Sequence, residues 1–87
     1  MTRRVTLEPK ALKELQDLFA LDRKTAQRCL RILTECSRTP FEGIGKPEPL
    51  KGSLSGFWSR RINDADRIVY EVTATEIVVH SLKGHYE

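Results

Sequence analysis

The chain has 87 residues, enough for one small domain with a modest core, spanning residues 1–87. Its 39% hydrophobic and 31% charged residues are typical of a soluble globular protein, and no apolar run approaches the roughly 20 residues of a membrane span. The N-terminus is basic but lacks the apolar stretch of a secretory signal. The net charge of +3 suits an anionic partner, either RNA or an acidic protein.

Two amphipathic helices are predicted after a short strand at Arg4–Leu7. The first begins near Pro9, since proline is tolerated at the first helical position. Its apolar residues recur at helical spacing: Ala11, Leu12, Leu15, Leu18 and Phe19. Asp22 is a suitable N-cap for the second helix, and Pro40 ends it because the residue before a proline avoids the helical region. The apolar stripe of the second helix is Ala26, Cys29, Leu30, Leu33 and Cys36.

The two cysteines of the chain, Cys29 and Cys36, both fall on the second predicted helix. Their spacing separates them by about 10.5 Å along the helix axis, whereas a disulfide requires Cα atoms within about 7 Å. We therefore expect two buried free thiols, which favours a cytoplasmic location.

Residues 41–56 are rich in glycine and proline and are predicted to form a loop within the same domain. Three strands follow, over residues 57–63, 67–73 and 76–82. The sequence thus predicts a helical hairpin followed by a loop and three sequential strands. No internal repeat is visible in the sequence.

The register of the first two of these strands follows from their alternation. Matching the apolar faces pairs Ile62 with Ile68 and Trp58 with Val72, because a slip of one residue would bury the wrong set. This register makes residues 64–66 the turn. Trp58 is then expected in the core rather than as a platform for base stacking.

The opposite face of these strands carries arginines. Arg61 and Arg67 are expected as diagonal neighbours roughly 7–8 Å apart, on a face left open because the helices cover the side of Ile68 and Tyr70. Arg60 falls on the apolar face and is expected to extend its charged end past the edge of the core.

The last strand is expected to turn back near residues 74–75 and to pair Val72 with Ile77, Tyr70 with Val79, and Arg67 with Leu82. This pairing brings the C-terminal His85 and Tyr86 to the end of the sheet where the arginines lie. The direction of the His85 side chain is left open, because Gly84 interrupts the alternation.

These residues include the groups that phosphodiester cleavage by a ribose 2′-hydroxyl requires: a base, a cation and an acid. Glu48 is the candidate base, since the prolines on both sides of it stiffen its loop. Arg61 and Arg67 carry planar guanidinium groups that match a phosphate. His85 is the candidate acid because its pKa lies near neutrality.

Other residues supply substrate contacts. Lys46 and Lys51 flank the loop and are candidates for binding RNA phosphates, and Tyr86 is placed to stack on a splayed base or to orient the scissile phosphate. Each assignment has a structural alternative: a solvated loop charge, a solvated strand face or an exposed terminus. The convergence of these residues through the strand register favours the functional interpretation.

Residues 46–51, 56–62 and 67–70, together with the terminal His85-Tyr86, resemble the YoeB/Txe toxins of bacterial toxin–antitoxin systems, within the RelE-like superfamily. The resemblance is nearly continuous from about residue 39 to residue 70. It implies an α+β fold of the RelE-like type, with a mostly antiparallel twisted sheet and an N-terminal helical hairpin packed on one face. The first helix departs from the family, because it has few aromatic residues, and Glu87 extends the chain beyond the usual His-Tyr end.

The resemblance also implies a function: a ribosome-dependent endoribonuclease, or mRNA interferase, that cuts mRNA in the A site and needs no metal or other cofactor. It implies that Glu48 is the general base, that Arg67 stabilises the phosphate and that His85 is the general acid. The expected substrate-binding residues are Lys46, Lys51, Arg61 and Tyr86. The expected partners are a YefM-like antitoxin, the ribosome with its mRNA, and a second copy of the toxin.

Two other functions fit the same scaffold. One is a non-enzymatic inhibitor like the ParE branch, which targets DNA gyrase, and the other is a catalytically silent partner for an antitoxin. The presence of Glu48, Arg61, Arg67 and His85 together favours the nuclease.

Overall fold

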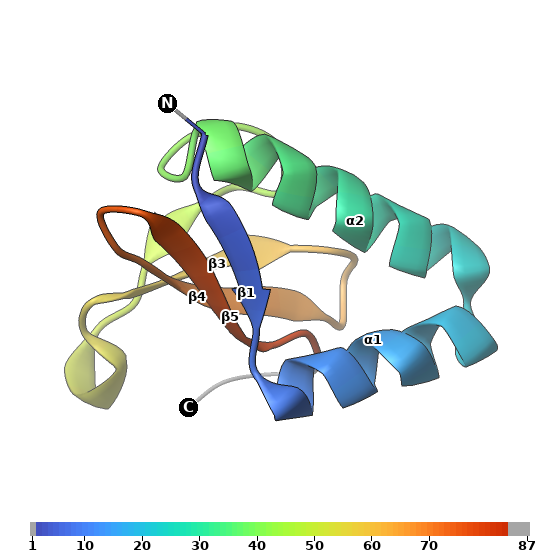
Figure 1. The fold of residues 1–87 in the computed structure, drawn as a ribbon. Coiled ribbons are helices and arrows are strands. Elements are labelled where there is room, and N and C mark those ends of the chain that lie inside the picture. Colours follow the sequence, from blue (N-terminus) through green and yellow to red (C-terminus); the bar gives the residue numbers. More distant parts are fainter. Residues whose placement is uncertain (1, 84–87) are drawn as a thin grey trace.

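The computed structural model describes residues 2–83 (Figure 1). This part of the chain contains two α-helices, one 3-10 helix and five strands. In chain order they are β1 (Arg4–Leu7), α1 (Pro9–Leu21), α2 (Arg23–Arg38), β2 (Glu48–Pro49), η1 (Gly52–Leu54), β3 (Phe57–Arg61), β4 (Arg67–Val72) and β5 (Glu76–Ser81). The predicted α+β class is confirmed. Neither α1 nor α2 is long and apolar enough to span a bilayer.

The strands form one sheet in the order β1-β5-β4-β3-β2, with β1 parallel to β5 and the other pairs antiparallel. β1 therefore lies beside the last strand although it comes first in the chain (Figure 1). The short strand β2 forms the opposite edge, next to β3. The mostly antiparallel sheet is confirmed.

The helical hairpin forms as predicted, with local differences. Asp22 caps α2, since its carboxylate accepts hydrogen bonds from the backbone N–H and the hydroxyl of Thr25. Leu30 is 42% exposed, so its placement in the apolar stripe was wrong. Ile32 is fully buried on α2. On α1 the predicted apolar residues Leu12 and Phe19 are also exposed.

The core lies between the helices and one face of the sheet, where Ile62, Ile68, Tyr70, Ile77 and Val79 are buried against residues of both helices. Trp58 packs against this core as expected and also contacts Phe41, with ring centroids 4.9 Å apart. Cys29 and Cys36 are buried free thiols, as predicted. Burial raises the pKa of Cys29 to about 12 and also raises that of Cys36.

The register between β3 and β4 differs from the prediction by two residues. Trp58 pairs with Tyr70, and Arg61 lies directly opposite Arg67 rather than diagonal to it. A shift of two residues keeps every side chain on its predicted face. The turn begins one residue earlier than predicted: Ile62 N–H donates to the Asp66 carbonyl, and the Asn63 side chain accepts hydrogen bonds from the backbone N–H groups of Ala65 and Asp66.

Between β4 and β5, the predicted pairs Val72–Ile77 and Tyr70–Val79 are confirmed. A bulge between Val69 and Tyr70 then shifts the register by one residue, so Val69 pairs with Ser81. The predicted pairing of Arg67 with Leu82 does not follow this register and was wrong.

The second face of the sheet is less open than predicted. Arg61 is exposed and Arg67 half-buried, but Ser59 and Val69 on the same face are buried. The Ser59 hydroxyl has no hydrogen-bond partner among residues 2–83.

Candidate active site

Glu48 stands at the edge of the sheet, on a strand that the sequence did not predict. The two residues of β2 pair Glu48 with Ser59 and Pro49 with Trp58. Proline is compatible with an edge strand because its missing N–H faces away from the ladder. Glu48 is therefore held by the sheet as well as by its two prolines, and its side chain remains 53% exposed.

The structure brings Glu48 together with Arg67. Arg67 Nη1 lies 3.4 Å from Glu48 Oε1, and the Arg67 side chain is 22% exposed. A carboxylate and a guanidinium are thus in contact across β2, β3 and β4, since β3 lies between their strands. Glu48 and Arg67 are 19 positions apart in the sequence.

Arg61 adds a second guanidinium to this edge. It lies directly opposite Arg67, and like charges in a cross-strand pair destabilise a sheet. Glu48 offsets part of this repulsion through its contact with Arg67. An anion bound between the two arginines would offset more of it.

Lys46 and Lys51 are both exposed, close in sequence to Glu48. Lys46 adopts a left-handed backbone conformation, with φ of 52°, immediately before Pro47. Lys51 precedes the 3-10 helix η1. No ion pair of either lysine is seen among the described residues.

The predicted acid His85 and the predicted substrate contact Tyr86 lie outside the described residues. The last strand before them, β5, ends at Ser81, and Ser81 pairs with Val69, two residues from Arg67. Glu87, the departure from the family pattern, also lies outside the described residues.

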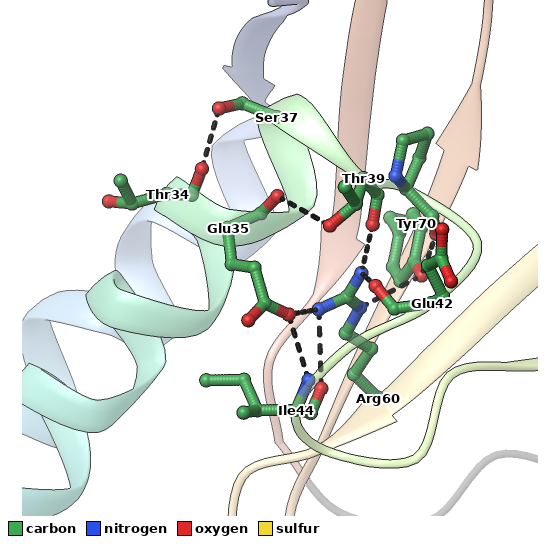
Figure 2. A network of polar contacts seen from close by, with 9 residues as sticks. Thr34, Glu35, Ser37, Thr39, Glu42, Ile44, Arg60 and Tyr70 are labelled. Atoms are coloured by element: carbon green, nitrogen blue, oxygen red, sulfur yellow. Dashed lines mark hydrogen bonds and ion pairs between the residues drawn. The ribbon is translucent and has the colours of Figure 1, made fainter.

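Sequence reasoning missed the group that anchors the loop before Glu48. The sequence predicts that the charged end of Arg60 extends past the edge of the core, and this prediction was wrong. The Arg60 side chain is fully buried on the helix side of the sheet. Figure 2 shows it surrounded by Glu35 of α2, Tyr70 of β4 and the loop that follows α2. An arginine on an apolar strand face was the available signal, because such a charge needs a buried partner.

The Arg60 guanidinium and its two side-chain partners, Glu35 and Tyr70, influence one another's pKa values. The hydrogen bond from Arg60, 2.7 Å long, lowers the pKa of Glu35. Burial lowers the pKa of Arg60, but hydrogen bonds to Tyr70 and Glu35 outweigh it and leave that pKa raised. Both groups therefore stay charged near neutral pH, and Tyr70, whose pKa burial raises, stays neutral.

A hollow of about 550 Å³ lies at the end of α2, lined by Arg31, Thr34, Glu35, Arg38 and Thr39. Within residues 2–83, no group of three or more His, Cys, Asp or Glu side chains is placed to hold a metal ion.

Comparison with known proteins identifies the family. The profile of the YoeB-like toxins of bacterial type II toxin-antitoxin systems matches residues 7–86. The chain belongs to this family. The resemblance drawn from the sequence is therefore confirmed, and the chain is the toxin component of a type II toxin–antitoxin system.

Individual YoeB proteins agree with this assignment. Toxin YoeB of Mycobacterium bovis is 48% identical over 84 residues, covering 97% of this chain and 99% of the relative. The structure of a YoeB dimer from Staphylococcus aureus superposes with a TM-score of 0.89 at 37% identity, covering 99% of this chain and 100% of the other. A YoeB-YefM complex from the same organism gives 0.86 at 36% identity, with the same coverage.

Proposed function

We propose that this YoeB-like toxin is a ribosome-dependent endoribonuclease that cuts mRNA in the A site and so inhibits translation. The observation that carries the proposal is the contact of Glu48 with Arg67, 3.4 Å apart at the edge of the sheet. The 2′-hydroxyl and the adjacent phosphate of one nucleotide lie close enough together to meet a base and a guanidinium that touch each other. An exposed carboxylate is also open to a substrate arriving from solvent.

The reaction follows from these groups. Glu48 accepts the proton of the 2′-hydroxyl, and the freed oxygen attacks the neighbouring phosphorus. Arg67 and Arg61 stabilise the added negative charge of the five-coordinate phosphorus. The bond to the 5′ oxygen then breaks, and His85 gives that oxygen its proton. The products are a 2′,3′-cyclic phosphate, open to later hydrolysis, and a 5′-hydroxyl.

The cross-strand arginine pair supports this use of the site. Arg61 and Arg67 repel each other in the free protein, and a phosphate held between them relieves that repulsion. The stabilisation is greatest where the phosphate carries most charge, in the transition state. Lys46, Lys51 and Tyr86 complete the proposal as contacts to the flanking RNA. No step requires a metal or other cofactor.

The proposed partners follow from the relatives. The Staphylococcus aureus YoeB structures contain a dimer and a complex with YefM. We therefore expect a YefM-like antitoxin and homodimer formation. The proposed nuclease activity adds the ribosome with its mRNA as a partner and the cytoplasm as the place of action.

The test is translation of a defined mRNA with the toxin, with and without ribosomes, followed by primer extension. The proposal predicts cuts phased with codons, only when ribosomes are present. Equal cutting of the free mRNA would remove the A-site requirement. No cutting, with DNA damage after expression in cells, would favour a gyrase inhibitor, and no toxicity without antitoxin would favour a silent partner.

A further inference from the structure

Arg60 is a fully buried charge in a small domain, and its guanidinium is committed on every nitrogen. Nη1 donates to the Glu35 carboxylate at 2.7 Å and to the carbonyl of Ile44 at 3.2 Å. Nη2 donates to the carbonyls of Thr39 and Glu42. Nε donates to the Tyr70 hydroxyl at 3.3 Å. A buried charge persists only with such partners.

Three of these acceptors are backbone carbonyls from one irregular stretch, residues 39–44, which we call the guanidinium loop (Figure 2). Two further bonds fix the same loop: Ile44 N–H donates to Glu35, and the Tyr70 hydroxyl donates to the carbonyl of Pro40. The loop has no regular secondary structure to satisfy these groups. Its conformation therefore depends on the Arg60 guanidinium.

The glycines of this region are required by how closely the chain approaches the guanidinium. At Gly43, φ is +126° and an added Cβ would lie 1.8 Å from a Glu35 carboxylate oxygen. At Gly45, φ is +83° and an added Cβ would lie 2.8 Å from the Arg61 carbonyl. The Gly45 carbonyl also accepts a 2.6 Å hydrogen bond from Arg61 N–H. Directly after the guanidinium loop, the chain is thus also held by the β3 backbone at Arg61.

The guanidinium loop leads directly to the candidate base. Glu48 follows Gly45 by three residues, and its partner in the sheet is Ser59, the residue before Arg60. The residue after Arg60, Arg61, lies opposite Arg67. Arg60 therefore sits between the strand position that holds Glu48 and the one that faces Arg67, with its side chain on the other face of the sheet.

We propose that Arg60, through the guanidinium loop, is a positioning residue that sets the place of Glu48 relative to Arg67. The inference rests on the proposed nuclease function for its kinetic consequences but not for its geometric ones. Arg60 touches no substrate; it acts on the chain that carries the base. A displacement of about 1 Å in a reacting group can lower a rate by on the order of a hundredfold.

The alternative is that Arg60 only stabilises the fold. In that case a weakened network lowers the folded fraction, while the folded molecules cut at the normal rate. The positioning role and the stabilising role are separated by a variant that loosens the guanidinium loop but keeps the Arg60 side chain buried. Glu35→Ala does this, because it removes one acceptor and leaves the carbonyls and Tyr70. Glu42→Ala is the matched control, since it removes a glutamate of the same loop and keeps the carbonyl that Arg60 uses.

The kinetic test is single-turnover cleavage on programmed ribosomes, at temperatures where all variants are folded by circular dichroism. We expect Glu35→Ala to lower the maximal single-turnover rate by about tenfold to a hundredfold, with the half-saturating toxin concentration within about twofold, and Glu42→Ala to match the wild type. Against a Glu48→Gln background, Glu35→Ala should have almost no further effect, because the misplaced group is already inactive. Equal losses in both backgrounds would overturn the proposal.

A second measurement does not depend on cleavage. In the free toxin, Glu35→Ala should speed amide hydrogen exchange at Glu48 and shift the NMR resonance of the Arg67 Nε–H group, whereas Glu42→Ala should change neither. Arg60→Lys, which keeps the charge and loses the planar fork, should act like Glu35→Ala. An unchanged Arg67 resonance in both would refute the positioning role even if the toxin cuts no RNA. If the shifts appear without cleavage, positioning stands and the nuclease function fails.

Discussion

Replacing Arg60 by methionine is the most informative change to the fold. The side chain is fully buried, so a hydrophobic residue of similar length fits, but Glu35 and three loop carbonyls lose their donor. Removing one member of a buried charge pair costs about 3–5 kcal/mol. The loss of the Glu35 contact by itself should cost only the low end of this range, because the Glu35 side chain is 35% exposed and water can replace the lost contact. The three loop carbonyls that lose their donor add to this cost, and we expect the free energy of unfolding to fall by about 3–5 kcal/mol in total.

That loss is large for this protein. A domain of 87 residues is expected to be stable by about 4–13 kcal/mol. The assay is urea unfolding followed by circular dichroism. With a slope of about 1–1.5 kcal/mol per molar urea, the midpoint should fall by about 2–5 M in Arg60→Met.

Arg61→Met is the matched control, since it makes the same change at the next residue of the same strand. Arg61 is exposed and lies opposite Arg67, so its loss should change stability by less than about 0.5 kcal/mol. Equal midpoints for the two variants would refute the reasoning from burial. If Arg60→Met fails to fold, Arg60→Lys should still unfold at a lower urea concentration than Arg61→Met.

Three further predictions concern the same network and the core. Because Arg60 lowers the pKa of Glu35 in the folded state, the stability it adds is complete above the ordinary value of 4.5 and is lost as pH falls through the folded value. Urea midpoints of the wild type should thus fall more steeply below that pH than those of Glu35→Ala; parallel curves would contradict this. Gly43→Ala should unfold at a urea concentration at least about 1 M lower than the wild type, since its Cβ meets the Glu35 carboxylate; an unchanged midpoint would contradict the close approach. Cys29, whose pKa burial raises to about 12, should react with a thiol reagent at pH 8 only as fast as the domain opens; rapid labelling of the native protein would contradict its burial.

Periodicity explains how much of the fold the sequence predicts. A period of 3.6 places the helices, and a period of 2 assigns strand faces, so the faces of Ile68 and Arg67 are correct. Strand alternation repeats every two residues, and it cannot distinguish the predicted register from the observed one two residues away. The choice depends on the Asn63 side chain, which closes a turn that begins one residue earlier than the apolar pattern indicates. The bulge that pairs Val69 with Ser81 likewise leaves no trace in the alternation.

The surroundings of Arg60 depend on long-range contacts that no local pattern encodes. Glu35 lies 25 residues earlier, and the other acceptors are mostly carbonyls, which every residue carries. Strand β2 has two residues, one of them proline, and so falls below any strand pattern. Of the residues that the sequence predicts for the site, Glu48 and Arg67 are in contact, and their catalytic roles stay predictions. His85 and Tyr86 remain predictions.

The role of Glu48 as the general base is tested most sharply by the single-turnover rate at which Glu48→Gln cuts mRNA on the ribosome, compared with Glu42→Gln. Both changes remove one negative charge and nearly preserve shape, but Glu48 alone of the two contacts Arg67 among the residues described. A positioned general base contributes about a hundredfold to ten-thousandfold. We expect a loss of that size for Glu48→Gln and a rate within about twofold of the wild type for Glu42→Gln. Equal rates for the two variants, with both proteins folded, would contradict the assignment of Glu48 as the base.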